Sequence, residues 1–133
     1  MRFRTKGHTD IINLTESVAE TLSQSNLREG TVTISAIGST TGITTLEFEP
    51  GLAQTDVAAM LEEIAPYNRN YAHNATWGDD NGAAHLRSAL IGTSKTVPFV
   101  DAQLMLGTWQ QIVFIDFDTR PRERQVVVQV MGK

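Results

Sequence analysis

The chain of 133 residues has no cysteine, only four prolines and no long apolar run. Without cysteine it has no disulfide bonds, no thiolate metal site and no thiol nucleophile. No stretch reaches the roughly eighteen apolar residues that a membrane helix requires. No charged-then-apolar secretory leader precedes the first periodic segment. These absences predict a protein that has no membrane partner and is located in the cytoplasm.

The sequence also lacks a strong excess of positive charge. Its formal net charge of −4 disfavours a broad nucleic-acid-binding surface. The one local basic cluster, residues 120–124, is interpreted as a hairpin turn with solvated charges. A hydrophobic content of 41% with 20% charged residues is typical of a globular chain. The length predicts a single domain over residues 1–133.

Alternation of apolar and polar residues predicts most of the strands. Residues 31–37 and 43–49 alternate in this way, so each is expected to bury one face. Residues 110–118 and 125–131 are apolar on both faces, which predicts central strands covered on each side. Shorter strands are expected at residues 1–6, 96–100 and 103–106.

Helical spacing of apolar residues predicts three helices. The first has Leu14, Val18 and Leu22 on one face and begins at Thr15. The second begins at Thr55 with Asp56 and ends before Pro66, and the third covers about residues 81–90. Together the elements predict an α+β fold with packed, largely antiparallel, sandwich-like sheets and about three flanking helices.

The densest group of chemically capable side chains lies in residues 69–92. His73, Asp79 and His85 form a candidate metal set, because imidazoles and carboxylates bind divalent cations such as Mg²⁺ or Zn²⁺. Their spacing matches no standard zinc signature. In a second interpretation an acidic residue or Asn81 caps the helix, and both histidines bond to the backbone.

A third interpretation of the same segment is catalytic. On the expected helix, His85 lies away from the apolar face that holds Leu86 and Leu90, so its imidazole is available as an acid or base. Arg87 is close in sequence and is a candidate partner for an anion.

Two further segments are candidate substrate-binding elements. The glycine-bounded loop Ser39-Thr40-Thr41 offers backbone N–H groups and hydroxyls to a phosphate, or it is a strand connection with locally bonded hydroxyls. Trp109 is able to stack on a planar heterocycle while Gln110 reads its edge, or it anchors the sheet.

The whole chain resembles the YjbQ-like family, some members of which are described as secondary thiamine-phosphate synthases. The resemblance is carried by three motifs in order: Tyr71-Ala72-His73-Asn74, Asp79 to Leu86, and Leu106 to Ile112. It implies packed antiparallel strands with flanking helices, assembly as a homotrimer, and a polar site that includes both histidines and is suited to a metal.

The implied reaction joins an aminopyrimidine pyrophosphate to a thiazole phosphate and releases pyrophosphate. A divalent cation and hydrogen-bond donors would stabilise the leaving group. The residues assigned to this task are Asp79, Asp80, His85, Arg87 and the loop Ser39-Thr40-Thr41. Asn81, Trp109 and Gln110 complete the expected substrate site, in which Trp109 or Trp77 holds the pyrimidine ring.

The chain departs from the family pattern at Ser39, where many relatives have a histidine followed by threonine. Serine does not titrate near pH 7 and is a poor metal ligand, so a three-histidine site does not carry over to this chain. The alternative function is therefore a non-catalytic homotrimer that binds a metal or a phosphorylated metabolite in the same pocket.

Overall fold

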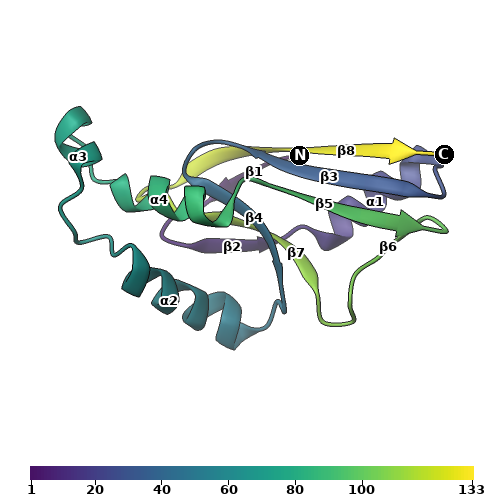
Figure 1. The fold of residues 1–133 in the computed structure, drawn as a ribbon, viewed down its shortest axis with the longest axis horizontal. Helices are drawn as coiled ribbons and strands as arrows, with labels where there is room; N and C mark the ends of the chain where they lie inside the picture. Colours follow the sequence, from purple (N-terminus) through teal and green to yellow (C-terminus); the bar gives the residue numbers. More distant parts are fainter.

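The fold consists of eight strands in two antiparallel sheets, with four α-helices around them, as the computed structural model of residues 1–133 shows (Figure 1). The strands are β1 (Arg2–Thr5), β2 (Asp10–Asn13), β3 (Gly30–Ile37), β4 (Thr41–Leu46), β5 (Ser94–Val100), β6 (Gln103–Leu104), β7 (Gln111–Asp116) and β8 (Arg122–Gly132). The helices are α1 (Thr15–Ser25), the π-helix η1 (Leu52–Asp56), α2 (Val57–Ile64), α3 (Ala72–Trp77) and α4 (Gly82–Ile91). No helix is both long and apolar enough to cross a membrane.

The two sheets pack face to face and enclose the main core. The five-stranded sheet has the order β1-β8-β3-β5-β6, and the three-stranded sheet has the order β2-β7-β4. Val32 and Ile34 of β3 meet Phe114 of β7 in this core, and α1 adds Val18 and Leu22. The predicted α+β fold with antiparallel sheets is therefore confirmed.

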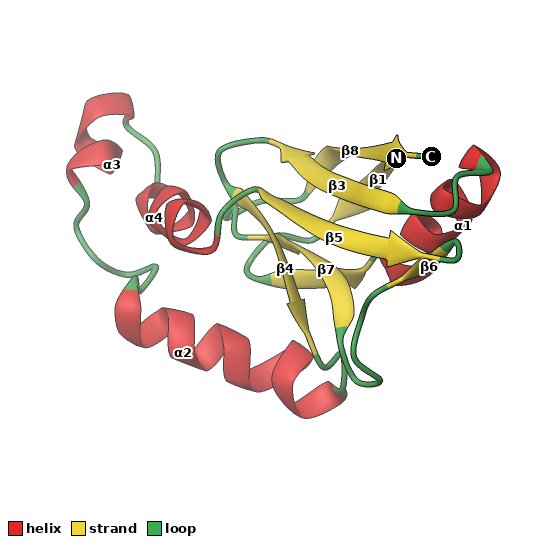
Figure 2. Ribbon diagram, turned by 45° about the vertical axis from the view of Figure 1, so that its right-hand side comes forward, coloured by secondary structure: helices red, strands yellow, loops and turns green.

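A second core lies on the other face of the three-stranded sheet, where α2 and α4 cover it (Figure 2). Leu61 of α2 and Ala84 of α4 pack there against Val113 and Ile115. Residues of β7 alternate between the two cores, since Phe114 faces the first and its neighbours face the second. This position confirms the prediction that β7 is buried on both faces.

The corresponding prediction for β8 is wrong within the single chain. Val126 is buried, but Val127 is 43% exposed and Met131 is 61% exposed. Ile37 at the end of β3 is also exposed on the five-stranded sheet. The reason is that both helices of the second core cover the other sheet, so no helix of this chain packs over these side chains.

The starts of two helices differ from the prediction. Thr55 and Asp56 do not cap the second helix, because the Glu49 carboxylate accepts the backbone N–H groups of Gly51 and Leu52, and the helical segment begins there as η1. The side chain of Asn13, rather than that of Thr15, accepts the N–H at the start of α1. Strand β2 and helix α3 were not predicted.

The basic cluster at residues 120–124 begins in the turn between β7 and β8 and continues into the start of β8, and its charges are not all solvated. Arg124 is only 10% exposed and makes two hydrogen bonds to the fully buried carboxylate of Asp116, at 2.6 and 2.7 Å. Arg122 donates to the buried Asp118 at 3.1 Å. The sequence predicted solvent-facing charges because Asp116 and Asp118, the partners of these arginines, lie in a segment that is otherwise apolar.

Candidate functional site

Helices α3 and α4 bring His73 and His85 together. The centroids of the two imidazole rings are 4.3 Å apart, with an angle of 52° between the ring planes. The chain turns between the helices at Gly78, whose left-handed φ of 67° suits glycine. At Gly82 a side chain would collide with Tyr71, so the absence of a Cβ atom allows the close approach of the two helices.

The loop between α3 and α4 supplies polar groups to one edge of the histidine pair. When the Asn81 amide is assigned from its hydrogen-bonding neighbours, its nitrogen donates to Nε2 of His73 at 3.1 Å and to the carboxylate of Asp79 at 3.3 Å. Nε2 of His73 lies 3.5 Å from Oδ2 of Asp79. Because Nε2 of His73 accepts, its proton in the neutral ring is on Nδ1.

His85 has a lowered pKa. Burial is the main cause, because it disfavours the charged imidazolium, and the nearby His73 acts in the same direction. The carboxylates of Asp118 and Asp79 and the backbone of Ser39 act in the opposite direction. The net effect is that His85 is neutral at pH 7 and is able both to donate and to accept a hydrogen bond.

Two surface hollows meet at His85. One, of about 380 Å³, is bounded by His73, Tyr71 and Leu86. The other, of about 420 Å³, is bounded by Ser39 and Thr93. His85 lines both hollows, so a small molecule is able to reach it from either one.

The predicted metal set does not assemble as three ligands. His73, Asp79 and His85 are neighbours, but no group of three histidine or carboxylate side chains is arranged to hold a metal ion. Nε2 of His73 is already engaged by Asn81. The residues present form a hydrogen-bonded cluster and do not fit a resident metal centre within one chain.

The structure places Arg87 away from the histidine pair, which contradicts the catalytic role predicted for it. Its side chain is 1% exposed and donates twice to the carbonyl of Ala65 and once to Thr9. It also pairs with Glu62 and lies 3.9 Å from the ring centroid of Tyr67. Arg87 thus joins α4 to the end of α2 and to the β1–β2 loop.

The other predicted catalytic residue, Asp80, also has partners outside the histidine pair. The hydroxyl of Thr119 donates to its carboxylate at 2.7 Å, and Arg120 lies 3.6 Å away. Asp80 therefore ties the α3–α4 loop to the turn between β7 and β8. Its side chain is 63% exposed and belongs to the rim of the site.

Of the predicted hydroxyl loop, only Ser39 is available to a ligand. It is exposed and bounds the same hollow as His85. Thr40 is buried and donates to Asp118, while Thr41 is buried and donates to the carbonyl of Gly38. The interpretation of all three hydroxyls as a phosphate cradle is wrong, because two of them are satisfied inside the protein.

Trp109 and Gln110 do not join this site. They lie in the connection between β6 and β7, at the opposite end of the molecule from α3 (Figure 1). Trp109 is 70% exposed, and Gln110 donates to Thr45 at 3.0 Å. Sequence reasoning also missed Asp118, whose charge acts on His85. The available signal was an aspartate at the end of an otherwise apolar run.

Comparison with known proteins gives one consistent result. The family model described as UPF0047 protein YjbQ-like matches residues 1–133. A UPF0047 protein of Methanothermobacter thermautotrophicus is 38% identical over 130 residues, which are 98% of this chain and 88% of that protein. One of Archaeoglobus fulgidus is 34% identical over 131 residues, 98% of each chain.

Solved structures agree with this result. A YbjQ-like protein of unknown function from Sulfolobus solfataricus has a TM-score of 0.91 and 27% identity, and the match covers 100% of this chain and 96% of that one. A hypothetical protein from Aeropyrum pernix has a TM-score of 0.89 and 30% identity, over 100% and 98% of the two chains.

Proposed function

We propose that this chain, which belongs to the YjbQ-like UPF0047 family, is a transferase of the thiamine-phosphate synthase type with its site at His73 and His85. The observation that carries the proposal is the pairing of a neutral, half-buried His85 with a second histidine at a place where two hollows meet. Perturbed histidines in concave sites are characteristic of acid–base function.

The proposed reaction requires leaving-group stabilisation more than it requires a base. The thiazole nitrogen forms a bond to the methylene carbon of the aminopyrimidine, and the bond from that carbon to the pyrophosphate oxygen breaks. The electron pair of the broken bond leaves with pyrophosphate, so negative charge grows on that oxygen. Groups that donate to the oxygen as the charge grows lower the barrier.

His85 is suited to this role. As a neutral imidazole it carries one N–H group, which is able to donate a hydrogen bond to the departing pyrophosphate oxygen as negative charge grows on it. The amide of Asn81, which also donates to Asp79, orients the neighbouring His73. The exposed hydroxyl of Ser39, which lines one of the two hollows with His85, offers a further hydrogen bond.

In the proposed reaction the divalent cation is bound to the substrate and not held by the protein alone. Pyrophosphate oxygens bind Mg²⁺ readily, whereas His73, Asp79 and His85 do not form a three-ligand set. We therefore expect the reaction to depend on Mg²⁺ supplied with the pyrophosphate substrate, and we expect no zinc to remain with the purified protein after dialysis.

The proposal includes a cytoplasmic homotrimer. The uncovered apolar side chains Ile37, Val127 and Met131 on the five-stranded sheet support self-association, because burying them releases water. Sedimentation should give three times the mass of one chain, and Val127→Lys should lower that mass. A monomer at all concentrations would contradict the assembly without bearing on the chemistry.

The decisive assay incubates the purified protein with both phosphorylated precursors, with and without Mg²⁺, and detects thiamine phosphate by mass spectrometry. Replacing His85 with alanine should lower turnover by about 10²-fold or more, as expected for the loss of a hydrogen-bond donor to the developing charge. Glu20→Ala, on the exposed face of α1, is the control and should retain full turnover. Full activity of His85→Ala would contradict the assignment.

The second candidate function is a non-catalytic homotrimer that binds a metal or a phosphorylated metabolite. The internal bonds of Arg87 and of the Thr40 hydroxyl favour it, since these groups are not free to stabilise a transition state. Calorimetric titration with inorganic pyrophosphate separates the two candidates. Binding that is lost in His85→Ala, with no product from the two precursors, would establish the binding protein.

A further inference from the structure

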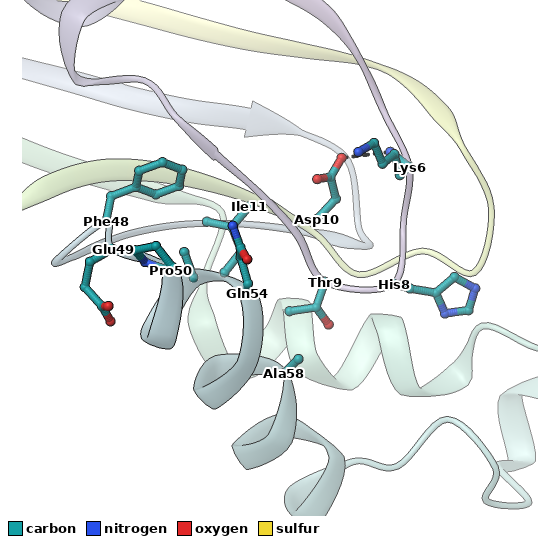
Figure 3. A pocket seen from close by; sticks show the side chains of 11 residues that line it. Lys6, His8, Thr9, Asp10, Ile11, Phe48, Glu49, Pro50, Gln54 and Ala58 are labelled. Carbon is teal, nitrogen blue, oxygen red and sulfur yellow. Dashed lines mark hydrogen bonds between the residues drawn. The ribbon is translucent and has the colours of Figure 1, made fainter.

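The largest cavity of the molecule is lined by residues from 6–11 and 48–58. It shares no residue with the two hollows at His85. Its volume is about 580 Å³, within the range of small-molecule sites. One wall is the β1–β2 loop with the start of β2, and the other is the β4–η1 turn with η1 and the start of α2 (Figure 3).

The backbone of both walls is unusual. Gly7, His8 and Thr9 have positive φ angles of 77°, 51° and 66° in succession, a conformation that costs roughly 1–2 kcal/mol for each residue with a side chain. The opposite wall contains the π-helix Leu52–Asp56, a rare form that is frequently found at functional sites. Such features persist only where the surrounding structure holds them in place.

The strained loop is held rigidly. The backbone N–H of His8 donates to the carbonyl of Asp118 at 2.7 Å, and that of Thr9 donates to Asp116 at 2.8 Å. Arg87 donates to the hydroxyl of Thr9 at 3.1 Å. The cavity wall is therefore formed before any ligand arrives, which lowers the entropic cost of binding.

The charged groups at one end of the cavity have opposite signs and unused bonding capacity. Lys6 belongs to none of the protein's ion pairs. Asp10 accepts the backbone N–H of Lys6 through Oδ2 at 2.8 Å, which leaves Oδ1 without a partner in the protein. Figure 3 shows the two residues side by side.

The remaining carboxylate of the cavity, Glu49, is committed to the protein. It accepts the backbone N–H groups of Leu52 and Gly51, and these bonds lower its pKa. The same bonds block the start of η1 as an anion site. Apolar surface fills the other end, where Phe48 and Pro50 lie opposite the charged pair (Figure 3), and Ile11 adds to it.

We infer that this cavity binds a small zwitterion, namely a free α-amino acid with an apolar side chain. The carboxylate of the ligand pairs with the Lys6 ammonium, and its ammonium donates to the free oxygen of Asp10. Its side chain rests on Phe48 and Ile11, where burial of apolar surface adds affinity. A simple anion or cation would satisfy only one of the two charged groups.

The test is a titration of the ¹⁵N-labelled full chain with L-phenylalanine, followed by amide chemical shifts. We expect the shifts to concentrate in residues 6–11 and 48–58. Lys6→Gln and Asp10→Asn should each weaken binding about tenfold, since each removes one charge-assisted hydrogen bond. Lys95→Gln, an exposed lysine outside the cavity, should leave the affinity unchanged.

Two analogues sharpen the test. L-Phenylalaninamide lacks the carboxylate and N-acetyl-L-phenylalanine lacks the ammonium, so each should bind the unmodified chain about tenfold more weakly. In Lys6→Gln the amide should bind as well as L-phenylalanine does, because the group it lacks no longer has a partner. Equal affinity of the unmodified chain for all three compounds would overturn the zwitterion.

The outcome is independent of the proposed transferase activity. His85→Ala should bind L-phenylalanine with unchanged affinity, because His85 does not line this cavity. No shift up to the solubility limit of L-phenylalanine and of L-leucine, or shifts centred outside the two walls, would refute the inference.

Discussion

Replacing Arg87 with methionine should destabilise the fold strongly while leaving the chemical groups of the histidine site in place. The guanidinium donates three hydrogen bonds, two to the carbonyl of Ala65 and one to the hydroxyl of Thr9. Leaving a buried acceptor without a partner costs about 1–3 kcal/mol, and the loss of the contact with Tyr67 adds about 1 kcal/mol.

The pairing with Glu62 contributes little to this sum. The Glu62 side chain is 46% exposed and returns to water when Arg87 is removed. Methionine also restores part of the apolar packing. We therefore expect a loss of about 3 kcal/mol in the free energy of unfolding, which for a chain of this length lowers Tm by roughly 10 °C.

Urea unfolding followed by far-ultraviolet circular dichroism measures this loss at matched protein concentration. Tryptophan fluorescence is a poor signal here, because Trp77 is 74% exposed and Trp109 is 70% exposed in the folded protein. The matched control is Arg28→Met, whose pair with Asp101 is exposed on both sides and should change stability by less than about 0.5 kcal/mol.

The opposite pattern would refute this reasoning. If Arg87→Met unfolds within about 1 kcal/mol of the unmodified chain but abolishes turnover, Arg87 is catalytic and the buried contacts do not stabilise the fold. If stability falls as expected, the remaining folded protein should retain turnover well below its new Tm.

Three further predictions concern the site and its support. The NMR titration midpoint of His85 should lie below 6.5 and should rise in His73→Ala, and an unshifted midpoint would contradict this. Because His85 binds protons less readily in the folded chain than in the unfolded chain, its contribution to stability is lost as pH falls below about 6.5. Gly82→Ala should separate α3 from α4, because the added Cβ would lie 2.6 Å from that of Tyr71, so the pKa of His85 should rise and turnover should fall, with Gly107→Ala as the neutral control. Asp116→Asn should cost about 3 kcal/mol in urea unfolding by removing the nearer of the two carboxylates that pair with the mostly buried Arg124, and a neutral result would show that the pair is not stabilising.

Elements with a strong local pattern were predictable from the sequence. Strand β3 alternates between buried Val32, Ile34 and Ala36 and polar neighbours, and this pattern requires no knowledge of the rest of the chain. Strand β2 has only four residues and no alternation. It forms because it pairs with β7 along the whole of its length. Helix α3 has six residues and no buried face, so periodicity gives no sign of it.

The candidate site was predictable in part, for the same reason. His73 and His85 lie close in sequence, and the structure joins them across one turn. The role of Arg87 depends on Thr9, which is 78 residues away in sequence. The residues around Arg87 in the sequence give no sign of this distant contact. The sequence therefore indicated an available cation where the structure has a buried structural arginine.

The position of β8 affects how the protein is made. β8 is an inner strand of the five-stranded sheet, between β1 and β3, and its pairing places Arg2 opposite Gln125. During synthesis most of the chain therefore leaves the ribosome before β1 has any partner strand. Until β8 emerges, β3 has only one of its two partners, β5. Long-range pairing of this kind slows folding, so a nascent chain exposes unpaired strand edges for its whole synthesis and is open to chaperones during that time.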